Sequence, residues 1–172
     1  MSGERSGVQK RVRLFAASAL YVHCRCHQLQ LAAIYAANDH NEIKKFFGTL
    51  LTIWKAIHYS PKKIEKLIHL EAELGVPELK IGKPSDTRWL ARESCVGAVR
   101  RVLPALIEAF EEIYAESGDA ETFGFSKILC TYKFVAGLFM QCDVLHSVVK
   151  LQGSLQSNDL DLSRFLLWWK VL

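Results

Sequence analysis

The chain has 172 residues, enough for one ordinary globular domain or for a piece of a larger one. Half of the residues are apolar and 23% are charged, a composition that excludes an intrinsically disordered chain. No apolar run approaches about 18 residues, and the first residues lack the apolar core of a signal peptide. We therefore expect no transmembrane helix and an intracellular protein, in which the five cysteines, an odd number, are reduced thiols.

The net charge of +4 is divided unevenly along the chain. Residues 1–101 contain 17 Lys and Arg against 9 Asp and Glu, a net charge of +8, whereas residues 102–172 contain 5 against 9, a net charge of −4. One interpretation is that only the first half faces a polyanion. The other is that the solvated helix faces of the two halves simply differ in composition.

The first third of the chain predicts helices around one short strand. Residues 5–17 have the periodicity of a basic amphipathic helix, and residues 19–23 (Ala-Leu-Tyr-Val-His) are rich in strand-forming side chains. A second helix is expected over residues 29–35. Asp39 with Glu42 three positions later forms a capping-box pattern, which predicts that the next helix begins there.

The middle of the chain contains the clearest start and stop signals. Ser60 followed by a proline predicts a helix start, and Gly75 predicts the end of that helix. Residues 76–86, with two prolines and a glycine, are expected to form a loop. Ser85 or Asp86 should then cap a long helix.

The long helix and its successors carry weaker signals. Pro104 lies within the apolar pattern of the long helix and should kink it or divide it in two. The triplet 117–119 (Ser-Gly-Asp) is expected to end it and to cap a helix that runs through Leu138. Asn158 with Asp161 predicts the start of a last helix, whose apolar end, Phe165–Leu172, we expect to bind a protein partner or a second copy.

A possible metal site lies at residues 23–27, His-Cys-Arg-Cys-His. Cys24 and His27 are three positions apart, so at a helix start they face one side and could share a zinc ion, the one cofactor that the sequence suggests. A structural zinc site needs about four ligands, and the chain has no second Cys or His pair at metal-ligand spacing. The alternative is that these residues pack and cap a strand-to-helix junction.

A possible nucleic-acid contact lies at residues 86–89, Asp-Thr-Arg-Trp. Trp89 could stack on a base while Arg88 and free backbone N–H groups hold a phosphate. The alternative is that Trp89 is a core residue that anchors the preceding loop, with Arg88 paired to an acidic neighbour. The sequence contains no phosphate-binding glycine loop, nucleophile elbow or His-Glu-x-x-His motif, and we expect no small-molecule substrate.

Three segments together resemble the hAT superfamily of DNA transposases, and most of all the vertebrate proteins of zinc finger MYM type that derive from them. The segments are residues 1–9 (Met-Ser-Gly to Gln), Tyr21 to Leu31 with its Cys-x-x-His, and Asp86 to Arg92 with its Arg-Trp-x-x-Arg. Residues 142–156 also resemble a later helical region of that family. The resemblance therefore extends over essentially the whole chain.

The apolar periodicity predicts a mostly α-helical chain, and the resemblance implies that it has two parts. Residues 1–38 would be the end of a ribonuclease-H-like core, with residues 20–23 as its last strand. Residues 39–172 would belong to a helical insertion that is incomplete at its C-terminal end. It also implies that Arg88 and Trp89 match the family's Arg-Trp, whose Trp stacks on a flipped-out base, and that Cys24 and His27 match its Cys-x-x-His.

The family's three metal-binding carboxylates would lie outside this chain, two before Met1 and one after Leu172. We therefore expect a catalytically inactive, nuclear, transposase-derived fragment that associates with DNA. Its contacts would be Arg88 and Trp89 together with the cations of the first helix, Lys10, Arg11 and Arg13. The alternative is a helical protein-interaction module that binds no DNA and no membrane.

Overall fold

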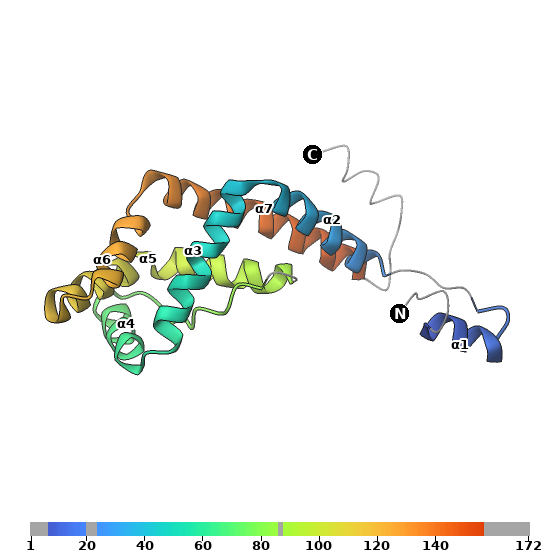
Figure 1. Ribbon diagram of the computed structural model, residues 1–172, viewed down its shortest axis with the longest axis horizontal. Coiled ribbons are helices and arrows are strands. Elements are labelled where there is room, and N and C mark those ends of the chain that lie inside the picture. The colour runs from blue at the N-terminus through green and yellow to red at the C-terminus, as the bar shows by residue number, and fades with distance from the viewer. Residues whose placement is uncertain (1–6, 20–23, 86–87, 157–172) are drawn as a thin grey trace.

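The computed structural model describes residues 7–19, 24–85 and 88–156, and this part of the chain is helical. Figure 1 shows its elements in order. They are α1 (Val8–Phe15), α2 (Arg25–Asp39), α3 (Asn41–His58), α4 (Pro61–Glu73), α5 (Trp89–Ser117), α6 (Ala120–Leu129) and α7 (Tyr132–Gln156). The predicted mostly α-helical class is confirmed. No strand occurs in the described ranges, and the strand expected at residues 20–23 lies outside them.

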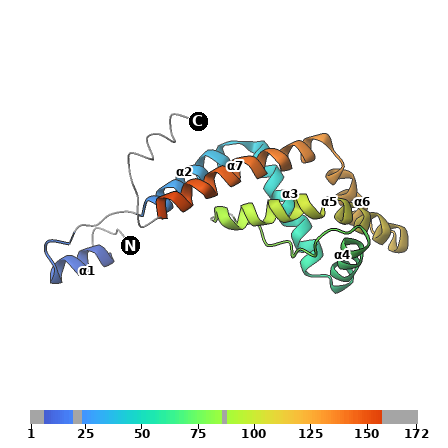
Figure 2. The ribbon, with the colours of Figure 1, turned by 180° about the vertical axis from the view of Figure 1, so that it is seen from behind.

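The long helix α5 is the centre of the packing. It contacts α4, α6 and α7, while α2 packs against α3 and α7. Figures 1 and 2 show α2 and α7 side by side along one edge, with α3 crossing from that edge toward α4. Fully enclosed side chains follow α5 along its length, from Cys95 through Val99 and Val102 to Leu106 and Phe110. This burial supplies the hydrophobic free energy that holds the helices together.

The expected helix boundaries at both ends of α4 are confirmed. The Ser60 hydroxyl accepts a hydrogen bond from the Lys63 backbone N–H at 3.4 Å, and Pro61 occupies the first helical position. Gly75 has φ +63°, and the N–H of Val76 donates to the Glu71 carbonyl at 2.8 Å. That six-residue closure is the Schellman motif, which needs the left-handed conformation that glycine adopts without strain.

The boundary between α5 and α6 also forms as expected. Gly118 ends α5 with φ +68°, and the Asp119 carboxylate accepts the Glu121 N–H at 3.0 Å to cap α6. However, the helix expected to run from there through Leu138 is two helices. The Thr131 hydroxyl accepts the Phe134 N–H at 3.2 Å and begins α7, a cap that the apolar periodicity on both sides concealed.

Two other expected boundaries were wrong, and the division of the long helix at Pro104 does not occur. Asp39 ends α2 instead of capping α3, whose N-cap is His40 with no side-chain hydrogen bond. The long helix α5 begins at Trp89 with Arg88 as its N-cap, so neither Ser85 nor Asp86 occupies that position. Pro104 does not divide α5, which continues for 29 residues. Tertiary packing on both sides of Pro104 outweighs the local cost of one missing backbone hydrogen bond.

One described helix, α7, is long and apolar enough to cross a membrane by length and composition alone. The sequence contains no unbroken apolar run here, because Asp143 and Lys150 interrupt the apolar residues. In the structure α7 packs against α5 and α2, and it buries Phe134, Leu138 and Leu145. Only 22% of this apolar window is buried in the structure, so most of the apolar surface of α7 is exposed.

The central position of α5 predicts a large loss of stability when a core side chain is shortened. Leu106 is completely buried, so Leu106→Ala should lower the free energy of unfolding by about 2–5 kcal/mol in urea denaturation. Leu14→Ala on α1, where the side chain is 77% exposed, should change it by less than about 0.5 kcal/mol. Equal effects of the two substitutions would contradict this arrangement of the core.

Candidate functional site

Trp89, the residue expected to stack on a base, lies in the core. Its side chain is only 4% exposed, and its indole N–H donates a hydrogen bond to the Gln30 carbonyl of α2 at 3.1 Å. A base could stack on this ring only if Trp89 left its position between α5 and α2. The geometry therefore matches the alternative interpretation, in which Trp89 anchors the start of α5 by packing.

Arg92, the last residue of the Arg-Trp-x-x-Arg segment, is also buried, at 4% exposure. Its guanidinium carbon lies 4.3 Å from the centre of the Phe47 ring and 5.4 Å from the centre of the Trp89 ring. Its Nε donates a hydrogen bond to the Ser85 carbonyl at 2.7 Å. Arg92 thus connects α3, α5 and the loop that precedes α5. We call this arrangement of Phe47, Trp89 and Arg92 the Arg92 stack.

The expected DNA-contacting cations do not converge on Trp89. Lys10, Arg11 and Arg13 are exposed on α1, which lies in Figures 1 and 2 beyond the ends of α2 and α7, apart from the start of α5. Arg88 is exposed at the N-cap of α5. The expected DNA contacts thus lie at two separate places, and the three cations of α1 are the more concentrated group.

Part of the excess positive charge of the first half is balanced within the chain. Cations of α4 face acids of α5 and α6 across the interface between these helices. Lys63 lies 3.3 Å from the Asp119 carboxylate, and Lys66 contacts the carboxylates of both Glu112 and Glu116. These contacts raise the pKa of Lys66 and lower the pKa of Glu116. The charge asymmetry therefore reflects an internal ion-pair network as well as a basic surface.

The metal-ligand pair lies at the start of α2. Cys24 and His27 are both exposed, whereas Cys26 is buried and its thiol donates to the Gln152 carbonyl of α7 at 3.7 Å. Within the described ranges, no group of three or more His, Cys, Asp or Glu side chains has the geometry to hold a metal ion. Two ligands alone are too few for a structural zinc site, and His23 lies outside the described residues.

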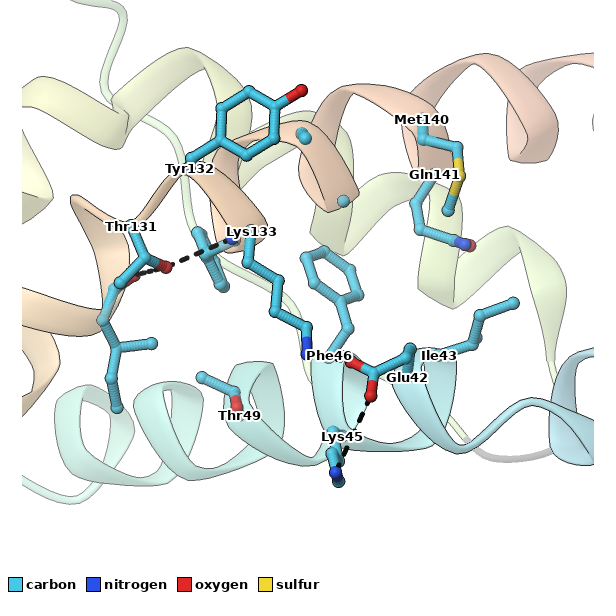
Figure 3. Close-up of a pocket in the computed structure, with 14 residues that line it drawn as sticks. Glu42, Ile43, Lys45, Phe46, Thr49, Thr131, Tyr132, Lys133, Met140 and Gln141 are labelled. Atoms are coloured by element: carbon cyan, nitrogen blue, oxygen red, sulfur yellow. Dashed lines mark hydrogen bonds and ion pairs between the residues drawn. The ribbon is translucent and has the colours of Figure 1, made fainter.

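A large apolar hollow, not anticipated from the sequence, lies between α3 and the start of α7 (Figure 3). Its volume is about 630 Å³, within the range of ligand and peptide sites. We call it the α3–α7 hollow. Its apolar lining residues are Ile43, Phe46, Ile128, Tyr132, Phe134, Ala136, Gly137 and Met140.

Charged side chains stand at the rim of the α3–α7 hollow. Glu42 of α3 pairs with Lys133 of α7 and lies 3.7 Å from Lys45, and Figure 3 shows Phe46 opposite Lys133 and Met140. The hydrogen bond from Lys133 and the charges of both lysines lower the pKa of Glu42. Apolar walls with a charged rim are typical of a protein-binding groove.

Comparison with known proteins adds nothing to this geometry: no family model, curated protein or solved structure matches the chain. The functional argument therefore depends on the surfaces of the chain itself. The α3–α7 hollow escaped sequence reasoning because its residues share the helical periodicity of the core. Only the exposure of side chains such as Met140, at 51%, separates them from core residues.

The environments of Cys24 and Cys95 predict opposite thiol reactivities. Backbone N–H groups of His27 and Cys26 at the start of α2 lower the pKa of the exposed Cys24 thiol, whereas burial raises the pKa of Cys95 to about 12. Because the thiolate is the reactive form, iodoacetamide should modify Cys24 at a lower pH than an ordinary thiol. Cys95 should react only after unfolding. Mass spectrometry of peptides alkylated between about pH 6 and 9 checks this, and equal rates at the two residues would contradict it.

Proposed function

We propose that this chain is a non-catalytic helical protein-interaction module that binds an apolar helical segment in the α3–α7 hollow. The observation that carries the proposal is the hollow itself, a space of about 630 Å³ with an apolar lining between two helices. Grooves of this kind bind the apolar face of an amphipathic helix.

The rim indicates what kind of helix would bind. Lys45 and Lys133 share the single carboxylate of Glu42, so the rim has a net charge of +1. This favours a ligand whose apolar residues are flanked by acidic ones. The chain contains an apolar segment of its own, Phe165–Leu172, with Asp159 and Asp161 before it, although Arg164 and Lys170 balance these two acids, so the match with the hollow is in the apolar residues. We therefore propose self-association, in which this segment of one copy binds the hollow of another.

Self-association through the hollow predicts a specific effect of Met140→Glu. A carboxylate in the apolar hollow would need desolvation on binding, so the dimer should dissociate roughly tenfold more readily, equivalent to about 1.4 kcal/mol. Sedimentation equilibrium of the full chain measures the change. Leu90→Glu is the matched control, because Leu90 is 53% exposed on α5 and is not among the residues that line the hollow.

A labelled peptide of residues 157–172 supplies an independent measurement. It should bind the full chain saturably in fluorescence anisotropy, and Met140→Glu should weaken this binding while Leu90→Glu leaves it unchanged. A monomeric wild-type chain that also fails to bind the peptide would refute the proposal.

A second candidate function is DNA association through α1. It is favoured by a specific observation, namely three cations within four residues on a helix that has no acidic residue and buries no side chain. Every charge on α1 is therefore available to a polyanion. In this version of the proposal Lys10, Arg11 and Arg13 contact phosphates, and Trp89 keeps its place in the core.

Salt dependence tests the DNA proposal. Anisotropy with a labelled single-stranded or branched DNA should show affinity that falls as salt rises. Replacing Lys10, Arg11 and Arg13 with Gln should reduce the slope of log K against log salt by about 2–3. The matched control replaces Lys55, Lys127 and Lys150 with Gln. It removes the same charge from other helices and should change the salt slope less. Trp89→Phe, which keeps the core filled, should leave the affinity unchanged, and absence of binding at low salt would end the proposal.

A further inference from the structure

Two of the five cysteines, Cys24 and Cys26, lie together at the start of α2. Because only one residue separates them, their Cα atoms are at most about 7 Å apart, and the Cα atoms of a disulfide are usually separated by about 4.4–6.8 Å. The two thiols also interact directly with each other. The pair is therefore a dithiol in which one sulfur can react with the other.

The two thiols have different surroundings. Cys24 is the N-cap residue of α2 and is exposed, and the backbone N–H groups of Cys26 and His27 lie near its sulfur. Cys26 lies in the first turn of the helix and is only 7% exposed. A reagent in solution therefore meets the Cys24 thiol first, and the partner best placed to react next with Cys24 is Cys26.

Cys26 connects the start of α2 to the end of α7. Figures 1 and 2 show these two helix ends side by side, and the Cys26 thiol donates a hydrogen bond to the Gln152 carbonyl of α7 at 3.7 Å. A sulfur that has lost its hydrogen cannot donate. A reaction that removes this hydrogen therefore also removes the bond between Cys26 and α7.

We propose that Cys24 and Cys26 form an oxidation site, at which hydrogen peroxide converts the two thiols into a disulfide and releases Cys26 from α7. In a reducing compartment such a disulfide is transient, as in redox-sensing proteins. The site lies near Gln152, at the opposite end of α7 from the α3–α7 hollow. It therefore stands or falls independently of the proposed function.

The reaction transfers two electrons from the thiols to the peroxide. The Cys24 thiolate attacks one peroxide oxygen, so a sulfur–oxygen bond forms, the O–O bond breaks, and the leaving hydroxide takes up the Cys24 proton as water. The Cys26 sulfur then attacks the sulfur of the Cys24 sulfenic acid. The S–S bond forms, the sulfur–oxygen bond breaks, and the Cys26 proton leaves with that oxygen as a second water.

Peptide mapping of the full chain after treatment with equimolar hydrogen peroxide is the direct test. Arg25 lies between the two cysteines, so trypsin separates Cys24 from Cys26. With free thiols blocked and no reductant, mass spectrometry should find residues 14–25 joined to residues 26–44, or uncut residues 14–44 lighter by two hydrogen atoms. Dithiothreitol should reverse both results.

Three variants assign the roles of the two thiols. Cys24→Ser should slow the consumption of peroxide at least roughly tenfold, because it removes the exposed thiol of the pair. Cys130→Ser is the matched control, since Cys130 is also exposed, and it should leave the rate unchanged. Cys26→Ser should stop the reaction at the Cys24 sulfenic acid, which dimedone then traps.

Hydrogen exchange measures the effect on α7. Oxidation should speed amide exchange over residues 150–156 by about threefold or more, and reduction should restore it. Exchange over residues 102–110, the buried middle of α5, should not change. A peptide map without the disulfide between Cys24 and Cys26, peroxide consumption that Cys24→Ser does not slow, or unchanged exchange at the end of α7 would each overturn the proposal.

Discussion

The Arg92 stack is the contact on which the arrangement of the helices depends. One guanidinium lies over Phe47 of α3 and beside Trp89 of α5, and it binds the carbonyl of Ser85 at the end of the preceding loop. Trp89 in turn bonds to α2 through Gln30. Three helices and the loop before α5 therefore meet at two side chains. A buried guanidinium is retained in such a place only because its polar and π partners replace water.

The Arg92 stack also explains why the Arg-Trp-x-x-Arg segment, which suggests a nucleic-acid contact from its sequence, has a structural role here. Arg and Trp suit phosphate and base recognition because one is a planar cation and the other a large aromatic ring. The same properties let them stack on each other in a core. Spacing alone cannot separate these two uses, since Trp89 and Arg92 lie three positions apart on one helix face in either case. The deciding quantity is burial, which depends on the position of α3 and α2.

The parts of the fold that the sequence predicts are those fixed by local chemistry. Ser60-Pro61, Gly75, Gly118 and Asp119 each require a particular backbone conformation or supply a particular hydrogen bond, so their roles survive in the structure. The helix start predicted at Asp39 and the helix division predicted at Pro104 do not occur, because the packing of α2 against α3 and of α5 against its partners outweighs these local signals. The α3–α7 hollow could not be predicted from the sequence for a related reason. A groove forms only where two helices pack against each other. The apolar residues that line a groove have the same sequence spacing as residues that fill a core.

The isolation of α1 has a consequence for how this chain can change over evolutionary time. Core residues are held by selection for stability, because most substitutions among them would lower the folded fraction. The eight residues of α1 bury no side chain, so this constraint does not reach them. Its cations can be gained, lost or rearranged at almost no cost to the rest of the molecule. For the same reason, selection for stability does not conserve the cations of α1, and only selection for binding a partner would conserve them.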